Sequence, residues 1–464
     1  MIQRGWITLS LVFGLLSVCQ AESKLPEPQI ETLSNGLTVA WFHDPRLPLV
    51  DVSLVVSAGK KSDLPHQSGV AELLAQTLTE VPLSGGSQPA WAELGVSPDS
   101  IVDEDSMLIG FHGLSRDAGA LLELLGKITL HATIQKEHLA LAQERYLQRM
   151  DHSVGAAIGL TTQVYRRLLS KGGPDGRSGV LNLKAIQNFK VGDLQAFYQT
   201  HFVPEKSILV LAGRLDVHEL RAAVQTVFGG WSSKAPVSSI PPKAPRLALR
   251  SKATSSQPVF LLEASELPHA QIRMGLKGPS ARDPDFYPLL VANTILGGGV
   301  NSRLNSQIRD PMGVTYSLGS TLSLNRDDSE LTIHAVTRND KVGPVIRRIQ
   351  ELIAAFPQDP LSSAEVSAAQ DFLLGGFALQ ASSLSSVVSL WLNGRVFGLD
   401  PHSPSEFPAK VQAVSVQRVK EVAKKYIQAN HLVVLVSGRV DEMKKSMASS
   451  KLRNLKQVVL TDLQ

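Results

Sequence analysis

Residues 297–319 read GGGVNSRLNSQIRDPMGVTYSLG, and this stretch narrows down the fold more than any other part of the chain. The glycines interrupt the apolar run before them, and residues 300–309 then favour a short amphipathic helix. The sequence Asp-Pro-Met-Gly at 310–313 ends that helix. Polar and apolar side chains alternate over residues 315–318, so a β-strand is expected to begin directly after the turn.

Two side chains flank the predicted turn. Arg309 lies at the end of the expected helix and Tyr316 at the start of the expected strand, so their tips can converge. A guanidinium group supplies several donors in a fixed geometry, and a phenol supplies one hydroxyl. Arg309 and Tyr316 are therefore candidate substrate-binding residues that could hold the backbone carbonyl of an extended peptide. A surface arginine beside a half-buried strand tyrosine is the simpler alternative, and these two residues alone leave it open.

The composition is that of a globular protein. The chain has 464 residues, of which 43% are hydrophobic and 19% are charged, so it can build more than one hydrophobic core. The formal net charge of +4 is small for this length, and the sequence contains no basic run interleaved with aromatic residues. Nucleic acid is therefore not an expected partner.

Residues 1–21 have the features of a secretory signal peptide, with a basic residue at Arg4, an apolar run and a small residue at Ala21. We expect export across the inner membrane and a periplasmic location. Cys19 is the only cysteine. Its surroundings resemble a lipoprotein signal, but Val18 is larger than the residue usually found there, so a lipid anchor is the less favoured alternative. No later apolar run reaches the ~20 residues of a membrane-spanning helix, so no membrane span is expected.

The chain contains an internal repeat. Residues 208–216 read ILVLAGRLD and residues 432–441 read LVVLVSGRVD, with the two Gly-Arg turns 225 residues apart. Residues 52–63 correspond in the same way to residues 272–283, at an offset of 220. Because the matches lie near opposite ends of each half, they indicate a duplicated α+β domain. Solenoid units are much shorter, at ~20 to 50 residues.

The repeat and the composition divide the chain into five expected segments. The linker is inferred from its prolines, serines and lysines, which show no periodicity. The segments are a signal peptide (1–21), an N-terminal domain (22–230), a linker (231–258), a C-terminal domain (259–445) and a C-terminal tail (446–464).

The pattern G-G-G-x-x-S-R-L-x-x-x-I-R-x-x-x-G-x-x-Y-S resembles a signature of the pitrilysin/insulinase family of zinc peptidases. The resemblance covers roughly residues 31–441. It implies two α+β repeats, each with a mixed, mainly antiparallel sheet backed by helices on one face. It also implies a half-subunit that closes with a second one around a peptide. In this family the half that carries the Arg/Tyr pair grips the substrate, and the other half holds zinc.

Active members of the family carry the zinc signature H-x-x-E-H on the first long helix of the N-terminal repeat. Two histidines four residues apart face one metal ion, the glutamate acts as general base, and a downstream glutamate completes the site. In this chain the two histidine positions are occupied by Glu72 and Gln76, and the general-base position by Ala75. The downstream region contains Glu144 and Asp151, and the sequence does not assign the third ligand position. The resemblance therefore implies a degenerate motif and no cofactor in this chain.

The resemblance points to a heterodimer that is inactive as separate chains. This chain would supply Arg309 and Tyr316, while a catalytic, H-x-x-E-H-bearing partner subunit would supply zinc, its ligands and the base for hydrolysing peptides in a closed chamber. Three alternatives stay open: an autonomous enzyme, a peptide-binding or chaperone-like module without a protease partner, and a structural homologue like the core subunits of the respiratory bc1 complex. Other catalytic motifs are missing, because the sequence lacks a phosphate-binding loop and a G-x-S-x-G elbow.

Overall fold

The computed structural model describes residues 25–64, 67–80, 90–132, 134–149, 154–170, 183–232 and 258–459. The predicted signal peptide, Cys19, Asp151 and nearly all of the predicted linker lie outside the described residues.

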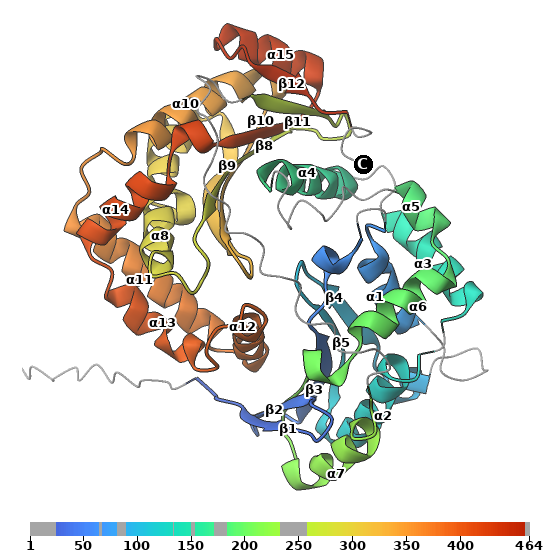
Figure 1. Ribbon diagram of the computed structural model, residues 1–464. Coiled ribbons are helices and arrows are strands. Elements are labelled where there is room, and N and C mark those ends of the chain that lie inside the picture. Colours follow the sequence, from blue (N-terminus) through green and yellow to red (C-terminus); the bar gives the residue numbers. More distant parts are fainter. Residues whose placement is uncertain are drawn as a thin grey trace, which may run out of the picture.

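Two six-stranded sheets form the framework, one in each half of the chain (Figure 1). Their strand orders are β1-β2-β6-β3-β5-β4 and β12-β7-β11-β8-β10-β9. The pairs β2–β6, β7–β11 and β7–β12 are parallel and the other pairs are antiparallel. Five strands of the second sheet therefore repeat five of the first in order and direction, and only the outer strands β1 and β12 differ. The predicted mixed, mainly antiparallel α+β fold is confirmed.

The strands of the first sheet are β1 (Gln29–Thr32), β2 (Thr38–His43), β3 (Leu49–Val56), β4 (Pro98–Val102), β5 (Met107–Leu114) and β6 (Ser207–Gly213). Those of the second sheet are β7 (Val259–Glu263), β8 (Ala270–Gly278), β9 (Thr315–Leu324), β10 (Ser329–Thr337), β11 (Val433–Gly438) and β12 (Leu455–Gln457). Because β12 pairs with β7, residues of the predicted C-terminal tail belong to the second sheet.

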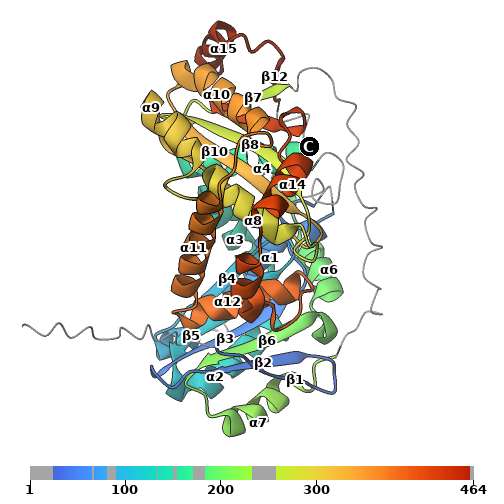
Figure 2. The same ribbon diagram turned by 90° about the vertical axis from the view of Figure 1, so that its left-hand side faces the viewer.

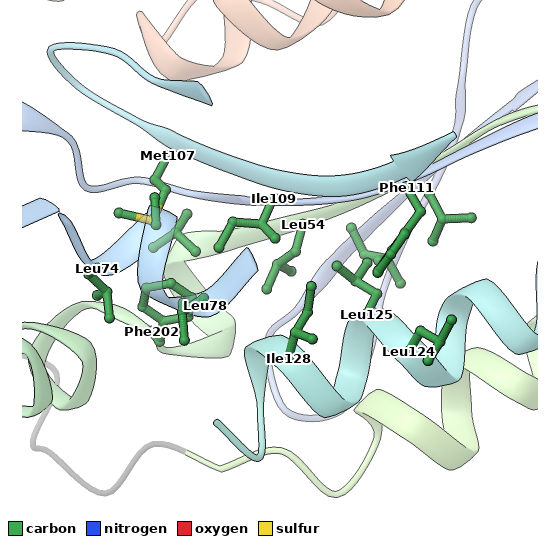
Figure 3. Close-up of a cluster of buried hydrophobic side chains, with 14 of the residues drawn as sticks. Leu54, Leu74, Leu78, Met107, Ile109, Phe111, Leu124, Leu125, Ile128 and Phe202 are labelled. Carbon is green, nitrogen blue, oxygen red and sulfur yellow. The ribbon is translucent and has the colours of Figure 1, made fainter. Parts of the chain in front are cut away.

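The first sheet buries one face under helices of its own half. Figure 3 shows Leu54, Ile109 and Phe111 of this sheet pointing toward Leu78 of α1 and Leu125 of α2. All five side chains are at most 2% exposed. The helices of this half are α1 (Val70–Glu80), α2 (Ala118–Thr129), α3 (Lys136–Arg149), α5 (Leu183–Asn188), α6 (Val191–His201) and α7 (Val217–Phe228). Burying each such side chain stabilises the fold by ~1.5–3 kcal/mol, so this face is the first core.

The second sheet is covered in the same way by helices of its own half. The apolar residues Ile272 and Met274 of β8 alternate with polar ones and pack into the second core. The helices of this half are α8 (Phe286–Asn293), α10 (Val342–Ala355), α11 (Ser363–Gln380), α13 (Ser403–Gln412), α14 (Val416–Tyr426) and α15 (Val440–Ser449).

Two helices are exchanged between the halves. Helix α4 (Val154–Leu169) belongs to the first half by sequence, but its Val164 and Tyr165 pack against Leu262 and Leu435 of the second sheet (Figure 1). Helix α12 (Leu384–Val396) belongs to the second half by sequence and packs on the first sheet. Each sheet therefore receives a helix from the other half on the face that its own helices leave open.

An aromatic contact anchors one of the exchanged helices. The ring of Trp391 in α12 meets Phe42 of β2 edge to face, with ring centroids 5.6 Å apart. Such pairs contribute ~0.5–1.5 kcal/mol beyond the buried area. Figure 2 shows α11 running from the second sheet toward the first half, where α12 follows it. The two halves therefore interlock through α4 and α12 within one chain.

None of the described helices is by itself long and apolar enough to cross a membrane. Helices α11 and α12 pass such a test only as a pair, by length and composition, and they are bent by 113° at the break between them.

Candidate functional site

The glycine-rich stretch continues α8 in two π-helical turns. The turns are η6 (Thr294–Gly298) and η7 (Asn305–Arg309), and the short helix α9 (Asp310–Met312) follows. A Cβ atom at Gly297 would lie 2.7 Å from the backbone nitrogen of Ser320 in β9, so only glycine lets the two segments approach this closely. π-Helical turns are rare and occur frequently at functional sites. The predicted short helix is thus present, in an irregular form that lies against β9.

Arg309 is the last residue of η7 and extends into solvent. Its side chain is 43% exposed. Among the described residues its only ion pair is with the neighbouring Asp310, at 3.6 Å between Nε and Oδ1. That separation exceeds a hydrogen bond and an exposed ion pair contributes little, so the guanidinium donors are free to bind another acceptor.

Gly313 turns the chain from this helix into β9. It adopts a left-handed conformation with φ of 61°, and its N–H donates to the carbonyl oxygen of Arg309 at 3.0 Å. The Thr337 hydroxyl then donates to the carbonyl oxygen of Val314 at 2.6 Å, which ties the start of β9 to the neighbouring strand. The predicted tight turn is therefore present between the helix and the strand.

Tyr316 lies at a β-bulge near the start of β9. Thr315 is opposite Thr337 and Ser317 is opposite Val336, so Tyr316 is the additional residue on its strand. Strand β9 is also the last strand of its sheet. Bulges are frequent at sheet edges and next to active sites. The backbone thus places Tyr316 just after the turn that follows Arg309. The side chain of Tyr316 lies outside what the structure describes. The convergence of the two side-chain tips therefore stays a prediction.

Arg303, which also belongs to the signature, has a different environment. Its side chain is 12% exposed, and it donates to Glu365 of α11 at 3.0 Å and to the carbonyl oxygen of Pro360 at 2.8 Å. Burial alone would raise the pKa of Glu365, but hydrogen bonds from Ser362 and Arg303 hold it below its usual value. Arg303 therefore fastens the stretch to α11, and sequence reasoning did not single it out.

The zinc-motif positions on α1 are occupied by an alternative polar network. The Glu72 carboxylate lies 2.9 Å from Nζ of Lys60 and accepts a hydrogen bond from the Tyr146 hydroxyl at 3.0 Å. The Gln76 amide donates to Glu80 at 2.8 Å. Ala75 is 1% exposed and has no ligand atom. The first histidine position thus holds a glutamate that is paired with a lysine ammonium, and the general-base position holds an alanine. These groups do not fit a zinc site of the H-x-x-E-H type.

The downstream ligand region supports the same conclusion. Glu144 of α3 is exposed and accepts a hydrogen bond from Gln148 at 3.1 Å. Tyr146 and Arg145 of α3 reach α1, where Tyr146 donates a hydrogen bond to Glu72 and Arg145 lies 3.3 Å from Glu80. Sequence reasoning missed Tyr146 because a tyrosine in an amphipathic helix carries no distinctive signal. Within the ranges that the structure describes, no group of three or more His, Cys, Asp or Glu side chains could hold a metal ion.

The start of α1 is held by a buried carboxylate. Asp63 accepts hydrogen bonds from the backbone N–H groups of Gly69, at 2.7 Å, and Ala71, at 3.1 Å. Burial raises the pKa of Asp63 to about 7, although these two donors oppose the shift. The Asp63 side chain thus caps the N-terminal turn of α1.

A family model described as the peptidase M16 inactive domain matches residues 188–373. Among curated proteins, an uncharacterized zinc protease of Mycobacterium leprae is 23% identical over 364 residues, covering 77% of this chain and 80% of that protein. The β subunit of the mitochondrial-processing peptidase of Lentinula edodes is 22% identical over 453 residues, covering 93% and 94%.

Solved structures share the fold. A protease from Helicobacter pylori superposes with a TM-score of 0.77 at 16% identity, over 89% of this chain and 100% of that one. A peptidase M16 inactive domain from Pseudomonas fluorescens gives 0.76 at 19% identity, over 89% and 98%. The first half of the periplasmic protease PqqL from Escherichia coli gives 0.70 at 14% identity, over 94% and 100%.

The chain therefore folds as two α+β repeats, like the peptidase structures on which it superposes. The comparisons confirm the resemblance to the pitrilysin/insulinase family. They further support a non-catalytic half-subunit of that family, since the matching family model is the inactive domain.

Proposed function

We propose that this chain is the non-catalytic, substrate-gripping subunit of a heterodimeric zinc-dependent peptidase that degrades peptides in a closed chamber. The observation that carries the proposal is a contrast between two candidate positions. Arg309 keeps an exposed guanidinium beside a bulged edge strand, whereas Glu72 is already engaged by Lys60 and Tyr146. The chain therefore offers donors for a substrate and no site for a metal of the family's type.

In this proposal Arg309 and Tyr316 hold the backbone of an extended peptide. Charge-assisted hydrogen bonds from a guanidinium to a carbonyl oxygen are about twice as strong as neutral ones. Strand β9 is the edge of its sheet, and an edge strand presents unpaired backbone groups along which an extended chain can lie. The residues of this chain thus bind and orient the peptide, and they do not act on the scissile bond.

Zinc, its ligands and the general base would come from a partner chain that carries H-x-x-E-H. The fold supports this division because each half-subunit of the family contains two repeats and closes against another half-subunit. The buried Ala75 leaves this chain without a base at the equivalent position. We accordingly expect no stoichiometric zinc in this chain alone.

A periplasmic location follows from the predicted signal peptide over residues 1–21. Cell fractionation of the full chain tests this part of the proposal. The expected result is recovery of a chain shortened at Ala21 in the periplasmic fraction. Recovery of the uncleaved chain in the cytoplasm would contradict it, and a membrane-bound, lipidated Cys19 would support the lipid-anchor alternative.

Co-expression tests the proposed heterodimer. The chain is produced alone and together with an H-x-x-E-H-bearing chain encoded beside it, and size exclusion, zinc content and peptide hydrolysis are measured on each preparation. We expect one zinc per heterodimer and peptidase activity only in the complex. Tightly bound zinc and activity in this chain alone would instead support the autonomous enzyme. Peptide binding without any such complex would support the chaperone-like module.

A further inference from the structure

The second sheet carries a cationic side chain on the face that is turned away from its own helices. Ile272 and Met274 of β8 point into the second core, so Arg273 between them points to the opposite face, where α4 packs. Arg273 lies directly opposite His334 of β10 in the strand register. An arginine and a histidine therefore meet as a cross-strand pair on the face that α4 shares.

Arg273 is half-buried. Across the described ranges no carboxylate lies within ion-pair distance of its guanidinium, and no acceptor is hydrogen-bonded to it. Burial lowers the pKa of Arg273, while Tyr165 raises it and Arg166 lowers it further. Removing an unpaired charge from water is costly unless another group compensates for it, so this position requires an explanation beyond stability.

The acids that pair with the other cations on this side of the sheet do not pair with Arg273. Glu104 pairs with Arg166 at 2.6 Å. Glu330, the remaining acid on this part of β10, pairs with Lys277 at 3.0 Å. Because neither carboxylate serves Arg273, the pair formed by Arg273 and His334 keeps its binding capacity for a group from outside the chain.

Two glycines next to Arg273 and His334 leave room above the sheet that side chains would otherwise fill. A Cβ atom at Gly275 would lie 1.8 Å from the Tyr165 hydroxyl, so the glycine admits α4. Gly319 of β9 is opposite His334, and a Cβ atom there would lie 3.2 Å from the imidazole. Gly319 also lies three residues after Tyr316 on the edge strand β9, along which the proposed peptide would lie.

We infer that Arg273, with His334 beside it, binds a carboxylate group of the peptide substrate. The inference rests on the proposed function and adds a substrate class to it, namely peptides with a free C-terminal carboxylate or an acidic side chain at this place. A guanidinium fork matches both oxygens of a carboxylate. Burial and the nearby Arg273 lower the pKa of His334, so its ring is neutral at pH 7 and serves as a hydrogen-bond donor beside the cation.

Direct binding to the isolated full-length mature chain tests this inference without the partner or its zinc. The probes are three fluorescent peptides of one otherwise neutral sequence: one with a free C-terminus, one amidated, and one amidated with an internal glutamate. Glutarate is the small-molecule carboxylate probe, and its binding is measured as a change in the melting temperature of the protein. The proteins are wild type, Arg273→Gln, Arg273→Lys, and Arg282→Gln as a control that removes an exposed arginine before α8.

We expect wild type to bind a carboxylate-bearing peptide at least about tenfold more tightly than the neutral amidated one. Arg273→Gln should abolish that preference, Arg273→Lys should restore part of it, and Arg282→Gln should leave it unchanged. A preference for the free C-terminus identifies the terminal carboxylate as the source, and a preference for the internal glutamate identifies the side chain. The Arg273→Gln protein should melt no lower than wild type, because it removes an uncompensated charge.

Equal binding of all three peptides by wild type, or an unchanged preference in Arg273→Gln, would overturn the inference while leaving the peptide-gripping function in place. A lower melting temperature in Arg273→Gln with a proportional loss of all binding would also overturn it, because Arg273 would then be structural. If none of the peptides binds but glutarate raises the melting temperature only when Arg273 is present, the carboxylate site stands and the proposed gripping function fails.

Discussion

The first helical segments of the two halves differ although the sheets that carry them repeat each other. Helix α1 is regular, and its polar positions are used internally by Lys60, Tyr146 and Glu80. The corresponding segment of the second half begins as α8, passes through two π-helical turns and ends with the exposed Arg309. One segment has thus become part of the packed interior, while the other keeps donors for a ligand. The two copies of the duplicated unit thus differ in whether these polar side chains have hydrogen-bond partners among the described residues.

The carboxylates at the starts of these helices differ as well. Asp63 is buried against backbone N–H groups, and burial raises its pKa to about 7. Burial also acts to raise the pKa of Asp285, but hydrogen bonds from Lys425, Arg418 and Tyr426 hold it below its usual value. The pKa values of these two aspartates are therefore shifted in opposite directions, so their contributions to stability depend on pH with opposite sign.

The largest effect is expected from restoring the general base. Ala75→Glu places a carboxylate where the side chain is 1% exposed, so it should lower the free energy of unfolding by at least about 3 kcal/mol. The same change in the triple variant with Glu72→His and Gln76→His should return weak zinc binding at best. Urea unfolding and metal analysis measure both outcomes.

Ala222→Glu on the exposed side of α7 is the matched control and should stay within about 0.5 kcal/mol of wild type. A stable Ala75→Glu protein, or tight zinc in the triple variant, would mean that the α1 positions are still a working metal site.

The second prediction concerns pH. Because the folded pKa of Asp63 is raised from 3.8 to about 7, the folded state binds more protons between these values, and this contribution to stability is lost as pH rises. Asp285 has a lowered pKa, so its contribution is present above the unfolded pKa and is lost as pH falls through the folded one.

Urea unfolding from pH 3 to 8 should therefore show opposite trends for the two variants relative to wild type. The stability of Asp63→Asn relative to wild type should rise as pH rises from about 4 to about 7. The loss of stability in Asp285→Asn relative to wild type should be smallest at the lowest pH. Asp99→Asn, at an exposed position of β4, serves as the control and should run parallel to wild type. Parallel curves for all three variants would contradict the contrast between the halves.

The third prediction concerns Arg309 in the assembled complex. Loss of a hydrogen bond from a charged donor costs about 1.5–3 kcal/mol, so Arg309→Ala should lower kcat/KM by roughly ten- to a hundredfold. Zinc content, dimerisation and melting temperature should stay as in wild type. Arg347→Ala, on the outer helix α10, is the control with the same loss of charge. A lower melting temperature with unchanged turnover by the folded complex would assign Arg309 a structural role.

The smallest effect is expected at Tyr316. Tyr316→Phe removes one neutral donor and keeps the ring, so kcat/KM should fall by about fivefold, equivalent to about 1 kcal/mol. A fall in kcat would indicate a hydrogen bond that strengthens toward the transition state, and a rise in KM alone would indicate binding only. Unchanged kinetics in both Tyr316→Phe and Arg309→Ala would refute the substrate-gripping role.

Much of the fold could be predicted because it depends on local periodicity. Polar and apolar residues alternate over 50–53, where β3 forms, and apolar residues recur at helical spacing over 69–79, where α1 forms. The same reasoning located the helix, turn and strand around Arg309 and Tyr316. These signals are readable in the sequence because side-chain period follows directly from backbone geometry.

Contacts between distant segments could not be predicted in this way. Nothing in the amphipathic pattern of α4 or α12 indicates which of two similar sheets it covers, because either apolar face would satisfy the helix equally well. The same limit applies to Tyr146 on Glu72, to Arg303 on Glu365, and to Arg273 opposite His334. Residue types and local periodicity were thus enough to predict the helices and strands and the duplicated architecture. Strand register and long-range packing decided which side chains became internal partners and which were left to bind something else.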